Sequence, residues 1–219
     1  MYNGDMAIEM CYIPEIEPWT KYPDLTQSRL IALSNELRRV RSECVTLFSP
    51  ADGDGDWSLG CRVYERTFFA IKALSKTVNW LDICSELRAL QFSFCVGSVP
   101  LRFYKGDPDD PPSRYLAHTP GEEQHIQTCF EFAGLPPVDT VLRLAVEVDA
   151  ARQASSIVFV EIDSHKDVIG KYRIPHTRQV AQIMPMQAPP VNLAPIVAEP
   201  IKKENSGKTI KEFINAAKK

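Results

Sequence analysis

The sequence predicts an α+β fold in which about five mainly antiparallel strands form a sheet and helices pack on one face. Three observations support this prediction. Two alternating runs meet at Gly97-Ser98, which is typical of a tight β-hairpin. Three further β-type runs follow one another from residue 141 to residue 174. Apolar residues with helical spacing occupy the stretches before the hairpin and between the two groups of strands.

The hairpin has the clearest signal. Gly97 takes the first central position of a two-residue turn, where a type II′ turn requires a positive φ. This turn predicts a register in which Phe92 faces Phe103 and Phe94 faces Leu101. Because side chains alternate along a strand, these four residues share one face and should belong to the core.

Helices are expected where apolar residues recur three and four positions apart. Asp24 and Gln27 have the spacing of a capping box at the first helix. Thr119 and Glu122 form a second box, with Pro120 at the first helical position. The predicted helices run from residue 24 to before Pro50, from about residue 58, from 78 to 87, and from 119 to 133.

The later strands are predicted at residues 141–149, 156–163 and 168–174, and their short links favour antiparallel pairing. Residues 1–23 contain three prolines and no sustained periodicity, so we expect an extended arm anchored by Trp19 and Tyr22. The predicted organisation is a single α+β domain at 1–180, a proline-rich linker at 181–203 and a basic amphipathic helix at 204–219.

Composition is that of a globular protein, with 44% hydrophobic and 24% charged residues in 219. The start lacks the pattern of a secretory signal, and no apolar run has the ~20 residues that cross a bilayer. We therefore expect a cytoplasmic protein without a transmembrane segment. Its cysteines have no CxxC spacing and are expected to be reduced core residues: Cys11, Cys44, Cys61, Cys84, Cys95 and Cys129.

Charge is unevenly spread along the chain. Residues 202–219 hold six lysines and two glutamates, a local charge of +4, whereas the whole chain carries −3. The first 201 residues therefore carry −7. Such an acidic body makes nucleic acid an improbable partner, because nucleic-acid binding depends on neutralising phosphates.

No catalytic motif is recognised, and no cofactor or metal is expected. His125 and Cys129 have the four-residue spacing of two zinc ligands on a helix, but the sequence shows no second pair nearby. We therefore interpret them as a partly buried histidine beside a core thiol. Acidic residues at strand ends leave one alternative, a small magnesium-dependent enzyme acting on a phosphate-containing substrate: Glu147, Asp149, Glu161 and Asp163, together with Asp107, Asp109 and Asp110.

Two groups of residues are candidates for binding. Arg102, Tyr104 and Lys105 lie on the second hairpin strand and, with basic residues of later strands, would form a cationic patch for an anionic ligand or an acidic partner. The later basic residues are Arg143, Lys171 and Arg173, with Tyr172 beside them.

The second group lies in the C-terminal segment. Ile210, Phe213 and Ile214 form an apolar stripe ringed by lysines. A helix this short is marginal alone in water, so it should form on a surface that buries the stripe. The sequence favours a non-catalytic interaction or regulatory protein whose tethered helix docks on a protein partner through residues 204–219.

Overall fold

The computed structural model describes residues 14–88, 91–133 and 140–176. Contacts divide the chain into two units, 1–178 and 179–219. The second unit lies outside the described residues, and with it the predicted linker and helix, including Ile210, Phe213 and Ile214. The first unit has the predicted α+β class.

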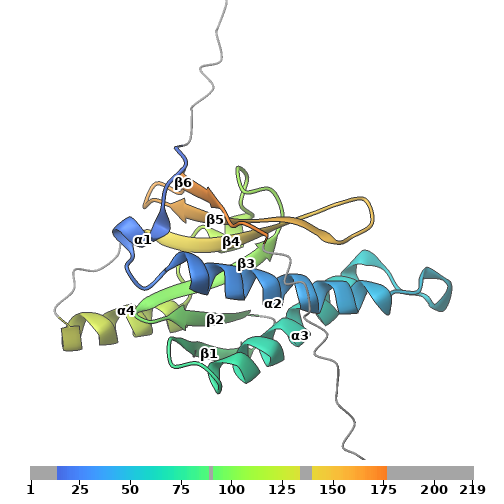
Figure 1. Ribbon diagram of the computed structural model, residues 1–219, viewed down its shortest axis with the longest axis horizontal. Helices are drawn as coiled ribbons and strands as arrows, with labels where there is room; N and C mark the ends of the chain where they lie inside the picture. The colour runs from blue at the N-terminus through green and yellow to red at the C-terminus, as the bar shows by residue number, and fades with distance from the viewer. Residues whose placement is uncertain (1–13, 89–90, 134–139, 177–219) are drawn as a thin grey trace, which may run out of the picture. The chain divides into compact units, whose positions relative to one another are not determined.

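Six strands form one sheet in the order β1-β2-β3-β4-β5-β6, one strand more than predicted (Figure 1). The strands are β1 (Leu81–Arg88), β2 (Gln91–Val96), β3 (Val99–Lys105), β4 (Val141–Val148), β5 (Ala154–Ile162) and β6 (Val168–Arg173). The α-helices are α1 (Pro18–Lys21), α2 (Gln27–Thr46), α3 (Asp56–Ser75) and α4 (Pro120–Ala133), and two short 3₁₀ helices are η1 (Pro50–Asp52) and η2 (Ser113–Tyr115).

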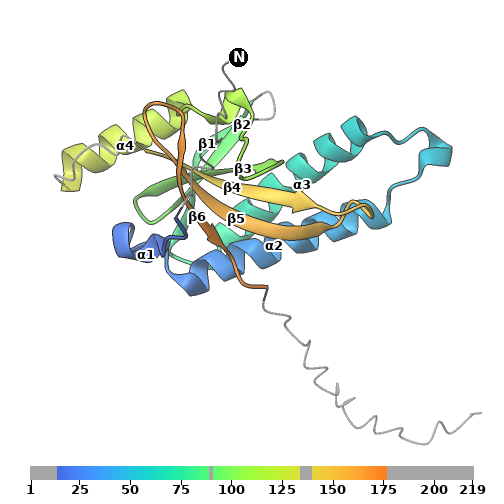
Figure 2. The same cartoon turned by 90° about the horizontal axis from the view of Figure 1, so that it is seen from above.

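Neighbouring strands are antiparallel except β3 and β4, which are parallel. A parallel return needs a long crossover, and the segment that contains η2 and α4 supplies it. Figure 2 shows α4 on the side of the sheet away from α2. The prediction that helices cover one face therefore holds for α2 and α3, whereas α4 packs on the opposite face against β1 and β3.

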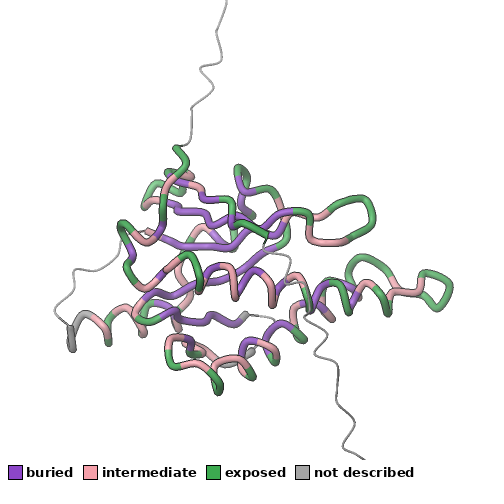
Figure 3. Tube along the Cα trace, in the orientation of Figure 1, coloured by how far each residue is buried: buried purple, intermediate pink, exposed green. Residues whose placement is uncertain are grey.

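The hairpin has the predicted register. Gly97 has φ +59°, and Phe94 pairs with Leu101. Phe92 and Phe103 lie with ring centroids 5.7 Å apart. All four side chains are buried in the main core between the sheet and helices α2 and α3, which Figure 3 shows as buried strands behind helices with exposed outer faces.

Asp24 caps this hairpin turn and not the helix that follows it. Its carboxylate accepts hydrogen bonds from the backbone N–H and the hydroxyl of Ser98, both at 3.0 Å. A Cβ atom on Gly97 would lie 2.2 Å from the Asp24 carboxyl carbon, so any other residue at position 97 would collide with this carboxyl group. The predicted box with Gln27 is wrong, because Thr26 is the N-cap of α2.

The predicted helix at 78–87 is also wrong, because Leu81–Arg88 is the edge strand β1. Leu81 and Ile83 face the main core, while Asp82 is exposed. The three-residue step from Leu81 to Cys84 fits a helix as well as a strand interrupted by a bulge, and the register shift between Ile83 and Ser85 is such a bulge. Pairing with β2 decides between the two.

The arm at the N-terminus is anchored as predicted where it is described. Trp19 lies edge-on to Tyr172, with centroids 5.2 Å apart. Tyr22 is buried and donates to the Glu161 carboxylate at 2.8 Å. Pro18 begins one helical turn, α1, so this part of the arm is not extended throughout.

The predicted capping box of α4 is confirmed, and its glutamate has a second partner. Thr119 N–H donates to Glu122 Oε2 at 2.8 Å, and Glu122 N–H donates to Thr119 Oγ1 at 3.3 Å. Glu122 also forms an ion pair with Arg143 of β4 at 2.7 Å, and both side chains are fully buried. The same guanidinium donates to the carbonyls of Tyr115 and Ala117.

We expect Phe92→Ala or Phe103→Ala to lower the free energy of unfolding by about 3–5 kcal/mol, because each leaves a cavity in the main core. Urea unfolding measures this loss. Phe69→Ala is the matched control, because Phe69 lies on α3 with 58% of its surface exposed, and it should cost less than about 1 kcal/mol. Equal small losses in all three variants would contradict the face assignment.

Glu122→Gln should cost about 3–5 kcal/mol, because it leaves the buried Arg143 charge without a counter-charge. Glutamine still satisfies a capping box, so the substitution isolates the ion pair from the cap. Glu123→Gln on the exposed neighbouring position is the control. Thermal and urea unfolding measure the loss of stability. If Glu122→Gln lowers the free energy of unfolding no more than Glu123→Gln does, the ion pair contributes nothing to stability.

Candidate functional site

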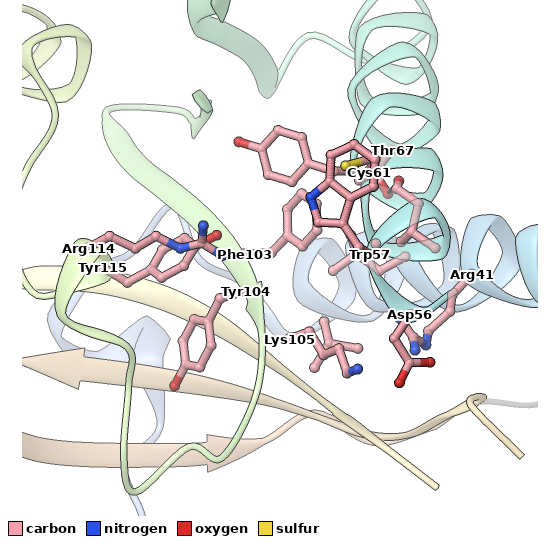
Figure 4. Close-up of a pocket in the computed structure, with 15 residues that line it drawn as sticks. Arg41, Asp56, Trp57, Cys61, Thr67, Phe103, Tyr104, Lys105, Arg114 and Tyr115 are labelled. Atoms are coloured by element: carbon pink, nitrogen blue, oxygen red, sulfur yellow. Dashed lines mark hydrogen bonds between the residues drawn. The ribbon is translucent and has the colours of Figure 1, made fainter. Parts of the chain in front are cut away.

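A pocket of about 320 Å³ lies between α3 and the second half of β3 (Figure 4). The β2–β3 pairing ends at Phe94 and Leu101, whereas β3 continues to Lys105 paired with β4. The pocket lies beside the part of β3 that follows this pairing, from Phe103 to Lys105. Its lining is Leu37, Arg41, Asp56, Trp57, Gly60, Cys61, Val63, Tyr64, Thr67, Phe103, Tyr104, Lys105, Arg114, Tyr115 and Val146.

Aromatic rings form much of the wall. Tyr64 stacks on Phe103 with centroids 5.3 Å apart, and Tyr104 lies 5.2 Å from Tyr115. Trp57, in the first turn of α3, has 81% of its surface exposed. An indole this exposed at the edge of a pocket is available to a ligand, because its apolar area is not used by the core.

Three cations and one carboxylate line the same pocket. Lys105 and Arg114 are exposed and Arg41 is buried, with its Nε donating to the Arg152 carbonyl at 2.6 Å. The hydrogen bond from Arg152 lowers the pKa of the Asp56 carboxyl, and the charges of Lys105 and Arg41 add to this effect. The pocket is therefore positive on balance.

The three predicted binding residues of β3 lie in the pocket lining or directly behind it: Arg102, Tyr104 and Lys105. Lys105 and Tyr104 line it. Tyr104 is buried, and its hydroxyl donates to the Asp107 carbonyl at 3.1 Å; burial raises the pKa of this phenol. Arg102 lies behind the wall, with its guanidinium 4.7 Å from the centroid of Tyr115.

The wider cationic patch does not form an open surface. In the pairing register Arg102, Arg143, Lys171 and Arg173 share one face, but Lys105 is on the other. Arg143 is buried with Glu122, while Lys171 pairs with Asp109 and Arg173 pairs with Glu147. These cations therefore serve contacts within the fold. The contact of Lys171 with Asp109 also anchors the loop after β3, to which Asp109 belongs.

The strand-end acids do not converge. Leu142 pairs with Glu161 and Glu147 with Ser156, so antiparallel β4 and β5 carry their acids to opposite ends. Glu161 is buried and is bound by the side chains of Lys21 and Tyr22. Asp163 accepts hydrogen bonds from its own turn. Within the described residues, the magnesium site of the alternative enzyme is not assembled.

The expectation that all cysteines are reduced is wrong for one pair. Cys84 of β1 and Cys95 of β2 form a disulfide, with Cα atoms 5.9 Å apart. Among the described cysteines, Cys44, Cys61 and Cys129 are free thiols. The sequence showed no close pair because these two partners meet only when the strands align.

Sequence analysis missed Arg41, Trp57, Tyr64 and Tyr115 as pocket residues. Arg41 lies within α2 and Tyr64 within α3, where the helical spacing of apolar residues gives no sign of a pocket. The exposed Trp57 was the available signal, because a tryptophan beside three aspartates in a polar loop is not a typical core position.

Comparison with protein-family models, with curated proteins and with solved structures finds no match for this chain. Its function is therefore inferred from its own residues. Among the described residues, no helix combines the length and apolar character needed to cross a bilayer.

We expect iodide to quench the fluorescence of Trp57 more efficiently than caesium, because cations outnumber carboxylates around the indole. The contribution of Trp57 is obtained by subtracting the Stern–Volmer slope of Trp57→Phe. Lys105→Glu should abolish the preference, because two cations then face two carboxylates. Lys76→Glu, an exposed lysine at the far end of α3, should leave the preference unchanged. Equal quenching by both ions would refute a positive pocket.

Proposed function

We propose that this chain is a non-catalytic interaction protein whose pocket binds an acidic segment of a protein partner. The observation that carries the proposal is the combination of Arg41, Lys105 and Arg114 with an aromatic wall around one concave site. Aromatic and arginine side chains are the residues that most often dominate binding energy at protein interfaces.

An acidic partner follows from the distribution of charge. The first 201 residues carry −7, yet three cations face a single carboxylate in the pocket. Lys105 and Arg114 form no ion pair with the described residues, so a ligand carboxylate does not have to displace an existing partner. An acidic segment would be repelled by most of the body and attracted at this place, which favours a defined orientation.

The chemistry of the pocket supports binding and not catalysis. Among the residues that the structure describes, no histidine lines the pocket, and its carboxylate, Asp56, has a pKa lowered by three neighbouring cations. A general acid or base that works near neutral pH needs the opposite shift. Cys61 lines the pocket without a histidine beside it, so it lacks the base that activates a nucleophilic thiol.

The C-terminal segment 204–219 is the second binding element in this proposal. Its apolar stripe of Ile210, Phe213 and Ile214 suits a groove on a partner, and its lysines suit an acidic rim. The segment and the pocket carry charge of the same sign. Like charges repel, so the proposal assigns this segment to an acidic surface of the partner and not to the pocket.

The proposal is tested with a fluorescein-labelled peptide of alternating glutamate and tyrosine, measured by fluorescence anisotropy on the full chain. Lys105→Glu combined with Arg114→Glu should weaken binding at least about 10-fold, because two attractive contacts become repulsive. Lys76→Glu should bind as the unsubstituted protein does. Added salt should weaken binding, since exposed charges are screened.

A peptide with lysine in place of glutamate should not bind. If it binds as well as the acidic peptide, or if the pocket variants retain full affinity, the pocket is not an acidic-segment site. In a second experiment, Phe213→Ala should reduce capture of partner proteins, while its melting temperature stays within about a degree or two of that of the unsubstituted protein. A large fall in melting temperature would place this segment in the core of its own chain.

A further inference from the structure

Three elements bring a set of soft metal ligands together on the α4 side of the sheet, away from the pocket lining. The ligand atoms of Cys84, Cys95 and His125 all lie within 4.8 Å of one another. Cys129 Sγ lies 3.5 Å from His125 Nε2. Cys84 belongs to β1, Cys95 to β2, and the other two to α4.

The backbone explains why three of these side chains meet, those of Cys84, Cys95 and His125, and why Cys129 lies beside the last of them. Ile83 pairs with Phe94 and Ser85 with Ser93, so Cys84 is the extra residue of a β-bulge. Bulges re-aim side chains, and here the bulge leaves Cys84 with its Cα 5.9 Å from that of Cys95 on the neighbouring strand.

Helix α4 approaches this bulge unusually closely. A Cβ atom on Gly121 would lie 2.5 Å from Cβ of Ser85, so only glycine permits the approach. Gly121, His125 and Cys129 are spaced four residues apart and lie on one face of α4. His125 and Cys129 therefore lie on the same face of α4 as Gly121, and this face packs beside β1.

We propose that Cys84, Cys95, His125 and Cys129 bind one Zn²⁺ ion in the reduced chain. Three thiolates and one imidazole form a donor set typical of structural zinc sites, where all four positions of a tetrahedron are occupied by protein. The pair at 125 and 129 had the right spacing in the sequence but no second pair. The β1–β2 pairing supplies that second pair.

The burial of the ligands suits a structural site. Cys95 is buried, while Cys84, His125 and Cys129 are half-buried. Cysteine binds zinc as the thiolate, so zinc binding by the reduced chain is expected to release protons.

The disulfide and the zinc site exclude each other. Two sulfurs that share a tetrahedral zinc at ~2.3 Å lie about 3.8 Å apart, so the bond between Cys84 and Cys95 must first be broken. An added phosphine reductant does this in a balanced step. It is oxidised to the phosphine oxide with the oxygen of one water, and the two hydrogens of that water become the thiol protons.

The test uses the full chain, reduced with the phosphine and titrated with Co²⁺ and then with Zn²⁺. The expected result is one Co²⁺ per chain, with thiolate charge-transfer absorption and the intense visible bands of tetrahedral cobalt, displaced by zinc. Cys84→Ser and Cys129→Ser should each weaken zinc binding at least about 100-fold, since even outer-shell changes cost 10–100-fold. Cys61→Ser, a half-buried free thiol outside the cluster, is the control and should bind normally.

A second measurement keeps the test independent of the variants. In the unsubstituted protein, zinc should raise the melting temperature after reduction, and it should have no effect while the disulfide is intact. The proposal is overturned if the reduced chain binds no cobalt, if the spectrum is that of octahedral cobalt without thiolate bands, or if Cys129→Ser binds zinc as tightly as Cys61→Ser.

Discussion

The buried ion pair between Arg143 and Glu122 holds together the face of the sheet that α4 covers. The Arg143 guanidinium donates hydrogen bonds to the Glu122 carboxylate and to the carbonyls of Tyr115 and Ala117. No part of either charged side chain reaches solvent. A buried charge that loses its partner costs several kcal/mol. Strand β4, the loop after β3 and the first turn of α4 must therefore assemble together, because each supplies a partner that the others require.

This constraint positions both candidate sites. On one side, Arg143 holds the backbone of Tyr115, whose ring lies 4.7 Å from the Arg102 guanidinium and 5.0 Å from that of Arg114. Arg114, one of the cations that line the pocket, is thus stacked on a ring whose position is fixed. Its side chain is already ordered before a ligand binds. On the other side, Glu122 fixes the start of α4, and His125 follows within one turn of the helix.

Local signals explain which parts of the fold were predictable. Gly97 and the pair Thr119 and Glu122 identified a turn and a helix start, because the interactions they report span only a few residues. Strand β1 was missed because a bulged strand and a short helix share the step from Leu81 to Cys84, and only pairing with β2 separates them. Both sites join residues distant in sequence, as Trp57 and Lys105 show, so a local pattern indicates only a part of each site, such as the spacing of His125 and Cys129.

Charge links the folded body to its C-terminal segment in the proposed function. The body carries −7, but its pocket and residues 202–219 are both positive, so both suit acidic surfaces. A partner with two acidic regions engages one element first, and the second contact is then intramolecular, at an effective concentration set by the linker. Under the proposed function, salt and the acidic body weaken each contact, so we expect tight binding only when both form. Selectivity for such a partner then follows from the spacing of its acidic regions as well as from their charge.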